Sequence, residues 1–172
     1  MFLGFAEIEN KWVLQDLIAQ KRLQKGSYGI VHHESPDRRG IDVGLIYQKD
    51  YMNVISSRTL EVTLETDPDF ATRDILYIQG ELNGEDELHI FLNHWSSRRG
   101  GEKETEHKRV EAARVLRKEV DKILAENPMA KIVIMGDFND YPTNKSMYVT
   151  LNAKGIPDFQ NGQLFNMAYK LE

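Results

Sequence analysis

The sequence contains no cysteine, no apolar run long enough to cross a membrane and no excess of basic residues. The absence of cysteine excludes disulfide bonds, thiolate metal sites and cysteine nucleophiles, and it leaves the compartment open. A membrane-spanning helix needs roughly 20 consecutive apolar residues, and no stretch approaches that length. The formal net charge is -5, whereas a tight non-specific nucleic-acid binder carries a basic excess. Any polyanionic substrate must therefore meet local positive charge.

The 172 residues are enough for one domain with a hydrophobic core, and we treat 1–172 as a single domain. The chain begins abruptly in an apolar stretch, with no visible signal peptide at Met1, and it stops at Leu171-Glu172, a dipeptide that often remains from a cloning site. We therefore expect an expressed fragment of a longer protein, in which case the lack of a leader leaves secretion open.

Hydrophobic patterning predicts a mixture of strands and helices. Strands are expected where apolar residues are continuous or alternate, at residues 2–8, 28–32, 41–47, 51–64, 74–82, 87–93 and 131–135. Helices are expected from Asn10, a candidate cap, to Gly26, and from Lys103 to Asn127, with a short helix after residue 143. Hairpins beside long helices predict an α/β (α+β) class, with helices packed on a mixed sheet.

Polar residues follow the apolar strand at 131–135, in the sequence Gly136-Asp137-Phe138-Asn139. Open α/β sheets bind ligands at the carboxyl ends of their strands. Asp137 and Asn139 are two residues apart, so in an extended segment they project to one side. A carboxylate beside a carboxamide can orient a water molecule and hold a phosphate oxygen. Taken alone, however, such a motif is more often a turn that merely reverses the chain.

A second candidate segment is Asn93-His94-Trp95, which follows the apolar strand at 87–93 and leads into Arg98 and Arg99. A histidine at a strand end can transfer a proton or donate a hydrogen bond to a phosphate oxygen. The two arginines offer bidentate phosphate contacts. A solvated basic loop with a structural histidine explains the segment equally well.

The third candidate is a glutamate, Glu7 or Glu9, at the junction between the first strand and the first helix. A carboxylate there can bind Mg²⁺, although an acid near a helix N-terminus is the more common explanation. Alternation places Phe5 and Glu7 on one side and Ala6 and Ile8 on the other, which does not decide between the two glutamates. Three such junctions in one chain nevertheless make coincidence a weaker explanation.

Four segments together resemble the endonuclease/exonuclease/phosphatase family, over residue 3 to about residue 150: Phe5-Ala6-Glu7-Ile8, Arg39-Gly40-Ile41-Asp42-Val43-Gly44-Leu45-Ile46-Tyr47, Asn93-His94-Trp95-Ser96-Ser97-Arg98 and Gly136-Asp137-Phe138-Asn139-Asp140. The last is the most specific. The resemblance implies a mostly antiparallel β-sandwich core flanked by helices. It also implies metal-dependent hydrolysis of phosphate esters, as in deoxyribonuclease-like enzymes, sphingomyelinases and inositol phosphatases.

The resemblance also implies roles for individual residues. Glu7 is similar to the glutamate that binds the catalytic Mg²⁺ or Mn²⁺, and Asp137 to the aspartate that orients or deprotonates the attacking water. Asn139 resembles its companion at the phosphate, and His94 resembles the histidine that donates a hydrogen bond to the phosphate in the transition state of an in-line attack. Further candidates for supporting the site or contacting the phosphate are Arg73, Arg98 and Asn93.

Two elements of the family pattern are missing: a strand carrying an asparagine ahead of the glutamate, and a terminal Ser-Asp-His element. None of the histidines, at positions 32, 33, 89, 94 and 107, lies near the C-terminus. We therefore expect a sandwich that is incomplete at both ends, and a chain that is weakly active or inactive although its parent is a magnesium-dependent phosphoesterase or nuclease. The alternative is a binding module that has kept the fold without the chemistry.

The expected partner is a phosphate ester, with nucleic acid among the candidates, and the motifs predict no narrower substrate. Substrate contact is expected from the loops at 33–40 and 96–106. An incomplete sandwich could also expose a strand edge and pair with a second copy of the chain.

Overall fold

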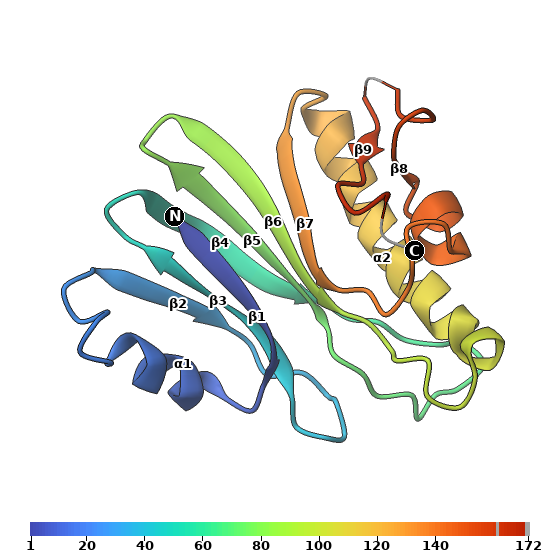
Figure 1. The fold of residues 1–172 in the computed structure, drawn as a ribbon, viewed down its shortest axis with the longest axis horizontal. Coiled ribbons are helices and arrows are strands. Elements are labelled where there is room, and N and C mark those ends of the chain that lie inside the picture. The colour runs from blue at the N-terminus through green and yellow to red at the C-terminus, as the bar shows by residue number, and fades with distance from the viewer. Residues whose placement is uncertain (161, 171–172) are drawn as a thin grey trace.

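The computed structural model describes residues 1–160 and 162–170, and it is built of four layers (Figure 1). A three-stranded sheet packs against a four-stranded sheet, helix α1 (Lys11–Ile18) covers the outer face of the first, and helix α2 (Glu102–Glu126) covers the outer face of the second. This is a mixed α/β fold with mostly antiparallel sheets, as the sequence predicts. None of the described helices is both long and apolar enough to cross a membrane.

The smaller sheet has the strand order β1 (Phe2–Ile8), β3 (Asp42–Gln48), β2 (Tyr28–His32), and both outer strands are antiparallel to β3. The larger sheet has the order β4 (Met52–Leu60), β5 (Ile75–Leu82), β6 (Asp86–His94), β7 (Lys131–Asp137). Its first three strands are antiparallel, whereas β7 runs parallel to β6. The parallel pair requires a long crossover connection, which α2 provides.

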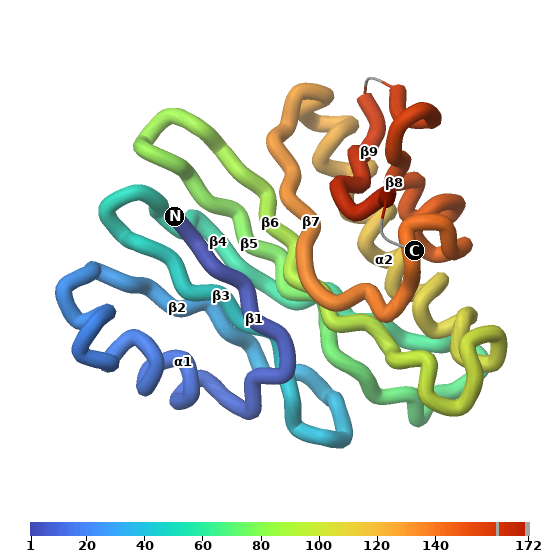
Figure 2. The backbone as a smooth tube through the Cα atoms, in the orientation of Figure 1, coloured from blue at the N-terminus to red at the C-terminus, as the bar shows by residue number. Residues whose placement is uncertain are grey.

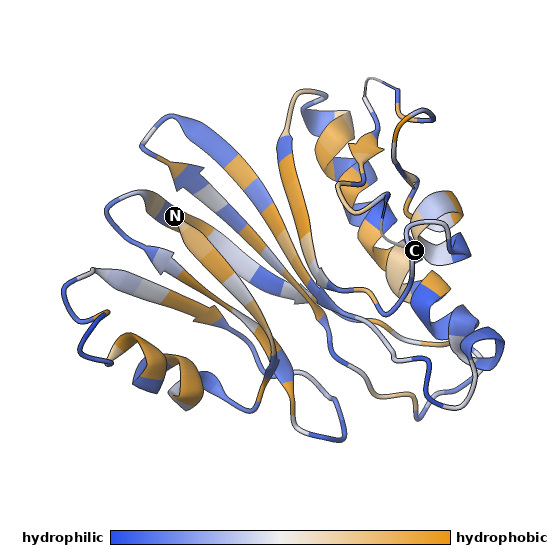
Figure 3. Ribbon diagram, in the orientation of Figure 1, coloured by the Kyte–Doolittle hydropathy of each residue, from blue (hydrophilic) through white to orange (hydrophobic). Residues whose placement is uncertain are grey.

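Three hydrophobic clusters hold the layers together. Between the sheets lie residues such as Leu45 and Ile90, and on the outer face of the larger sheet Phe91 packs against Leu116 of α2. Leu14 of α1 packs against Ile8 and Ile46 of the smaller sheet. Both faces of β5 and β6 are covered, so apolar residues occur on both faces of these strands, as in Ile90-Phe91-Leu92. Figure 3 shows hydrophobic residues along these strands, interrupted by polar ones, and along the helices.

The predicted strands are confirmed to within two residues at each end, apart from the one at 51–64, which ends at Leu60. Asn10 caps α1 by accepting from the backbone N–H groups of Trp12 and Val13, as expected. The helix ends at Ile18 rather than at Gly26, because residues 19–22 are exposed and have no layer to pack against.

The segment after residue 143 contains a single turn of π-helix, η1 (Lys145–Thr150), and two short parallel strands, β8 (Ala153–Lys154) and β9 (Leu164–Phe165). The short helix expected in this region is therefore present. The dipeptide Leu171-Glu172 lies outside the described residues.

Candidate active site

The alternation of side chains along β6 decides which residues after the strand reach the open end between the sheets. Leu88, Ile90 and Leu92 face the smaller sheet, and His94 continues that series. Phe91 faces α2, as does Trp95. Asn93 belongs to this second series and is fully buried, so it cannot reach the open end.

Strand β7 follows the same rule. Val133 and Met135 face the smaller sheet, and Asp137 continues that series. In the parallel register Asp137 lies directly opposite His94. The backbone trace in Figure 2 shows β1, β6 and β7 ending toward the same side of the molecule, the lower side in that view. Candidate groups from three separate segments of the chain therefore meet at one end of the sandwich.

His94 is the buried member of this group. Its side chain is 5% exposed, and its Nε2 lies 3.9 Å from Oδ2 of Asp137. Burial lowers the pKa of His94, as does the positive charge of Arg73, while the negative charges of Asp137 and Glu7 oppose the shift. The imidazole is therefore neutral near pH 7 and can donate one N–H.

Asp137 and Asn139 are held together by a turn and not, as expected, by an extended segment. The backbone of Asn139 is left-handed, with φ 51°, and its N–H donates to Oδ1 of Asp137 at 2.9 Å. The side-chain amide of Asn139 donates to the carbonyl of Trp95 at 3.0 Å. The motif is thus an Asp/Asn turn that follows Asp137 at the end of β7 and holds the Asn139 side chain at the carbonyl of Trp95.

Gly136 is required by the backbone between these strands. Its φ is 131°, and a Cβ there would lie 1.9 Å from the carbonyl oxygen of Asn93. A residue with a side chain would force β7 away from β6 and separate Asp137 from His94.

Glu7 reaches the open end through a β-bulge that the alternation argument did not foresee. Phe5 pairs with Gly44 and Ile8 pairs with Asp42, so β1 has one residue more than β3 over this stretch. The extra residue lets Ile8 pack with Phe5 on the α1 side, and Glu7 takes a left-handed conformation with φ 59°. The negative charge of Glu7 acts to raise the pKa of His94, which favours Glu7 over Glu9 as the glutamate of the site.

Arg73 supports the site from behind. Its Nε donates to the carbonyl of His94 at 3.0 Å, its Nη2 to the carbonyl of Trp95 at 2.6 Å, and its Nη1 to Oδ1 of Asp37 at 3.0 Å. The side chain is 6% exposed. This placement favours the supporting role over direct contact with a phosphate.

The guanidinium of Arg98 is also occupied by contacts within the protein. Its Nε donates to the carbonyl of Asn139 at 2.8 Å, its Nη2 donates to Oδ1 of Asn144 at 3.2 Å, and its guanidinium lies 4.5 Å from the centre of the Tyr141 ring. Asn93 donates to the carbonyls of Phe91 and Met135 and accepts from the indole of Trp95. Arg98 holds the loop after β7, and Asn93 holds the ends of β6 and β7 together. These contacts favour structural roles for both residues over the phosphate contacts expected for them.

The sequence interpretation missed two buried charged groups beside the site. Arg109 of α2 contacts Asp140, and both side chains are buried. A signal existed for Arg109, because it falls on the buried stripe of α2 together with Ala113 and Leu116. For the second group, Asp37, the sequence offers no comparable pattern.

A third polar group surrounds His32 at the start of the loop at 33–40. Its Nε2 lies 3.2 Å from Asp42 and its Nδ1 lies 3.9 Å from Glu34, with all three donor atoms within 4.8 Å of one another. The other oxygen of Asp42 accepts from the backbone N–H and the hydroxyl of Ser35. Asp42 therefore holds the start of this loop through Ser35, with His32 and Glu34 beside it.

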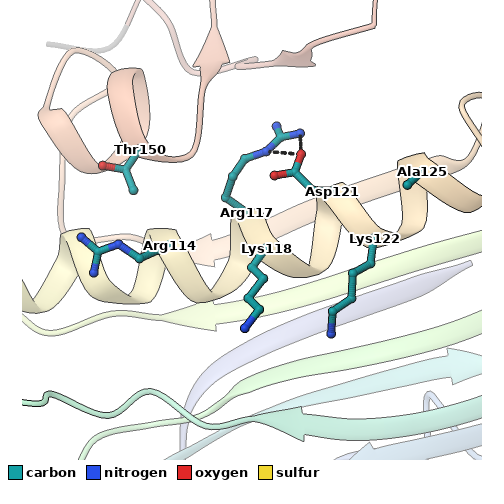
Figure 4. A pocket seen from close by; sticks show the side chains of 7 residues that line it. All are labelled: Arg114, Arg117, Lys118, Asp121, Lys122, Ala125 and Thr150. Carbon is teal, nitrogen blue, oxygen red and sulfur yellow. Dashed lines mark hydrogen bonds and ion pairs between the residues drawn. The ribbon is translucent and has the colours of Figure 1, made fainter.

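A shallow depression on α2 contrasts with the candidate site (Figure 4). Charged side chains line it, but Arg117 pairs with Asp121, Arg114 with Glu111 and Lys122 with Glu119. Three of the four lining cations are paired in this way, and the fourth, Lys118, is exposed, so the depression offers a phosphate little more than the charge of one lysine.

Comparisons with known proteins agree with this geometry. The chain belongs to the Endonuclease/Exonuclease/phosphatase family, whose family model matches residues 1–172. The relatives in this family are phosphodiesterases and phosphatases. No curated protein sequence matches the chain.

Several solved structures share the fold at low sequence identity. The human Nocturnin catalytic domain with bound sulfate is 18% identical, with a TM-score of 0.68 over 85% of this chain and 54% of that one. Truncated TDP2 from Caenorhabditis elegans is 20% identical, with a TM-score of 0.58 over 81% and 49%. ANGEL2, a 2',3'-cyclic phosphatase, is 15% identical, with a TM-score of 0.62 over 86% and 41%. The chain thus spans about half the length of these structures.

Proposed function

We propose that this chain carries part of the active site of a metal-dependent phosphoesterase, which cleaves a phosphate ester by in-line attack of water. One observation carries the proposal: His94 and Asp137 lie side by side on neighbouring parallel strands, and the charge of Glu7, from the other sheet, acts on the same imidazole. DNA, RNA and smaller phosphodiesters are all candidate substrates. Family membership supports the reaction class.

Asp137 is the group that orients and deprotonates the attacking water. Its side chain is 56% exposed, so water reaches it, and the N–H of Asn139 holds one of its oxygens. The other oxygen, toward His94, is free to accept the proton of a water molecule. Asn139 uses one amide hydrogen on Trp95 and has a second to donate to a phosphoryl oxygen.

His94 is a preorganised donor for the charge that develops on the phosphate. Arg73 fixes the backbone of His94, and burial keeps the imidazole neutral, so the Nε2–H can point at the position beside Asp137. A donor that is already oriented loses no energy to reorganisation during the reaction.

The residues present fit a divalent cation. Glu7 is exposed, and among residues 1–160 and 162–170 its carboxylate has no hydrogen-bond or ion-pair partner. Carboxylate oxygens are the ligands that Mg²⁺ and Mn²⁺ prefer, and Glu7 would hold the ion at this end of the sandwich, near Asp137. A bound ion would supply charge neutralisation at the phosphoryl and leaving oxygens.

The test is hydrolysis of bis(p-nitrophenyl) phosphate by the purified chain, with Mg²⁺ or Mn²⁺ and with a chelator, for the wild type and for Asp137→Asn. We expect weak, metal-dependent turnover that falls by about 10²- to 10⁴-fold in the variant, because the general base is lost. Asp121→Asn is the matched control, since Asp121 pairs with Arg117 on the outer side of α2.

Wild-type turnover no greater than that of Asp137→Asn would contradict the proposal. Binding of orthovanadate without any turnover would instead support the alternative, a module that keeps the fold without the chemistry.

A further inference from the structure

The loop that carries Asp137 and Asn139 is anchored to α2 by an ion pair that is removed from solvent. The side chain of Asp140 is 0% exposed and that of Arg109 is 1% exposed, and Nε of Arg109 lies 2.7 Å from Oδ1 of Asp140. The hydroxyl of Ser146 donates to the second oxygen of Asp140 at 2.5 Å. The negative charge of Asp140 is thus neutralised by Arg109 on the side of α2.

The guanidinium of Arg109 is itself fixed. Its Nη1 donates to the hydroxyl of Thr105 at 2.8 Å, and its Nη2 donates to the backbone carbonyl of Glu102 at 2.8 Å. Both partners belong to the first turns of α2. The ion pair therefore ties the loop after β7 to the start of the helix that precedes β7.

A second arginine reaches the same carboxylate from the outer side. Nη2 of Arg98 lies 3.5 Å from Asp140, while its Nε holds the carbonyl of Asn139. Asp140 is thus the common partner of two arginines that enclose the turn. Asn139 needs such support, because its left-handed backbone is an uncommon conformation for a residue with a side chain.

Stability alone is a poor reason for burying these charges. A well-packed apolar pair of similar volume is often as stable as a buried ion pair or more stable, because burying two charges costs so much solvation energy. Leaving one of two buried opposite charges without its partner is costly, so this pair, unlike an apolar contact, favours a loop position that keeps Asp140 against Arg109.

We propose that Asp140, with Arg109 beneath it, is a positioning residue that sets where Asn139 and Asp137 stand relative to His94. This inference rests on the proposed function, since it concerns the same reaction. Neither Asp140 nor Arg109 touches the open end of the sandwich, and both act through the turn. Misplacing a reacting group by about 1 Å can cost about 10²-fold in rate.

The first experiment compares Asp140→Asn with Glu119→Gln. Asparagine keeps the shape of Asp140 and its acceptor for Ser146 but removes the charge that faces Arg109. Glu119 of α2 also forms an ion pair, at 2.5 Å from Arg58 of β4, with its side chain 11% exposed, and it lies further along α2 from the turn than Arg109 does. We expect kcat to fall about 10- to 100-fold in Asp140→Asn with KM unchanged, and no change in Glu119→Gln.

The second experiment does not depend on activity. In ¹⁵N–¹H spectra of the chain, the backbone and side-chain amides of Asn139 report on the turn, because one is held by Asp137 and the other by Trp95. We expect both signals to shift in Asp140→Asn and the side-chain amide to exchange faster with solvent, whereas Glu119→Gln leaves them in place. If Asp140→Asn does not fold, Ser146→Ala is the milder variant for the same measurement, because it removes one contact to Asp140.

The two experiments separate the two proposals. A wild-type chain without turnover, but with Asn139 signals that move in Asp140→Asn, would contradict the proposed function and support the positioning role. Asn139 signals that stay in place in both Asp140→Asn and Ser146→Ala would overturn the positioning role, whatever the turnover.

Discussion

Two buried arginine–aspartate pairs flank the candidate site, and they hold it in different ways. Arg73 binds the backbone carbonyls of His94 and Trp95 directly, and Asp37 occupies its remaining nitrogen. Arg109 touches no backbone of the loop after β7 and holds it through the carboxylate of Asp140. The first pair fixes the main chain of a catalytic candidate, whereas the second fixes the loop through a side chain.

Both pairs differ from the carboxylates that we propose for catalysis at this end of the sandwich. The paired charges are buried and hold backbone in place. Glu7 and Asp137, the carboxylates assigned to chemistry, are exposed at the end of the sandwich. Exposed carboxylates remain available to a cation or to water, while the buried pairs fix the backbone segments around them.

The largest effect on stability is expected from removing one arginine. Arg109→Met leaves Asp140 buried without its principal partner, and the free energy of unfolding should fall by about 3–5 kcal/mol. Each aspartate keeps a second arginine, Arg39 at 3.6 Å from Asp37 and Arg98 at 3.5 Å from Asp140. Arg73→Met should nevertheless cost less, because the side chain of Asp37 is 6% exposed and that of Asp140 is 0% exposed. Urea denaturation of the two variants measures both changes. Equal losses would mean that the two pairs differ less than their geometry implies.

Another buried aspartate, Asp74, sharpens the comparison because no arginine of residues 1–160 and 162–170 forms an ion pair with it. Burial raises its pKa from 3.8 to about 6; hydrogen bonds from Thr59 and Val62 oppose the shift, and the negative charges of Glu61 and Asp42 add to it. Between about pH 4 and pH 6 the folded protein therefore holds more protons than the unfolded chain, and this residue lowers the stability as the pH rises through that window.

Asp74→Asn should remove that dependence. Relative to the wild type, the variant should gain roughly 2 kcal/mol of unfolding free energy between pH 4 and pH 7. Taking the difference between the two proteins cancels the opposite contribution of His94, whose lowered pKa favours the folded state as the pH rises toward 6.5. Urea denaturation at both pH values measures the difference. A gain of the same size at both would show that folding does not raise the pKa of Asp74.

The smallest effect is expected from an exposed pair. Arg117 and Asp121 form an ion pair on α2, and the side chain of Asp121 is 60% exposed. Exposed pairs contribute about 0–1 kcal/mol, so Asp121→Asn should leave the urea midpoint almost unchanged. A loss comparable with that of Arg109→Met would mean that burial does not separate the two kinds of pair.

The strands and the long helix could be predicted from the sequence because each is decided by its own pattern. Alternating or continuous apolar residues mark β1 to β7, and apolar residues at helical spacing mark α2. The end of α1 could not be predicted in this way, because it depends on where the neighbouring layer stops. The bulge at Glu7 depends likewise on how β1 pairs with β3.

The sequence by itself determined the family, the strand ends that carry Glu7, His94 and Asp137, and the chemistry those residue types permit. The tertiary structure decided which neighbouring polar residues face the site: strand alternation directs His94 to the open end and Asn93 into the core. It also turned Arg73 and Arg98 inward onto carbonyl groups. Motifs record local preference, whereas the partners of a buried charge come from distant segments that meet only when the chain is folded.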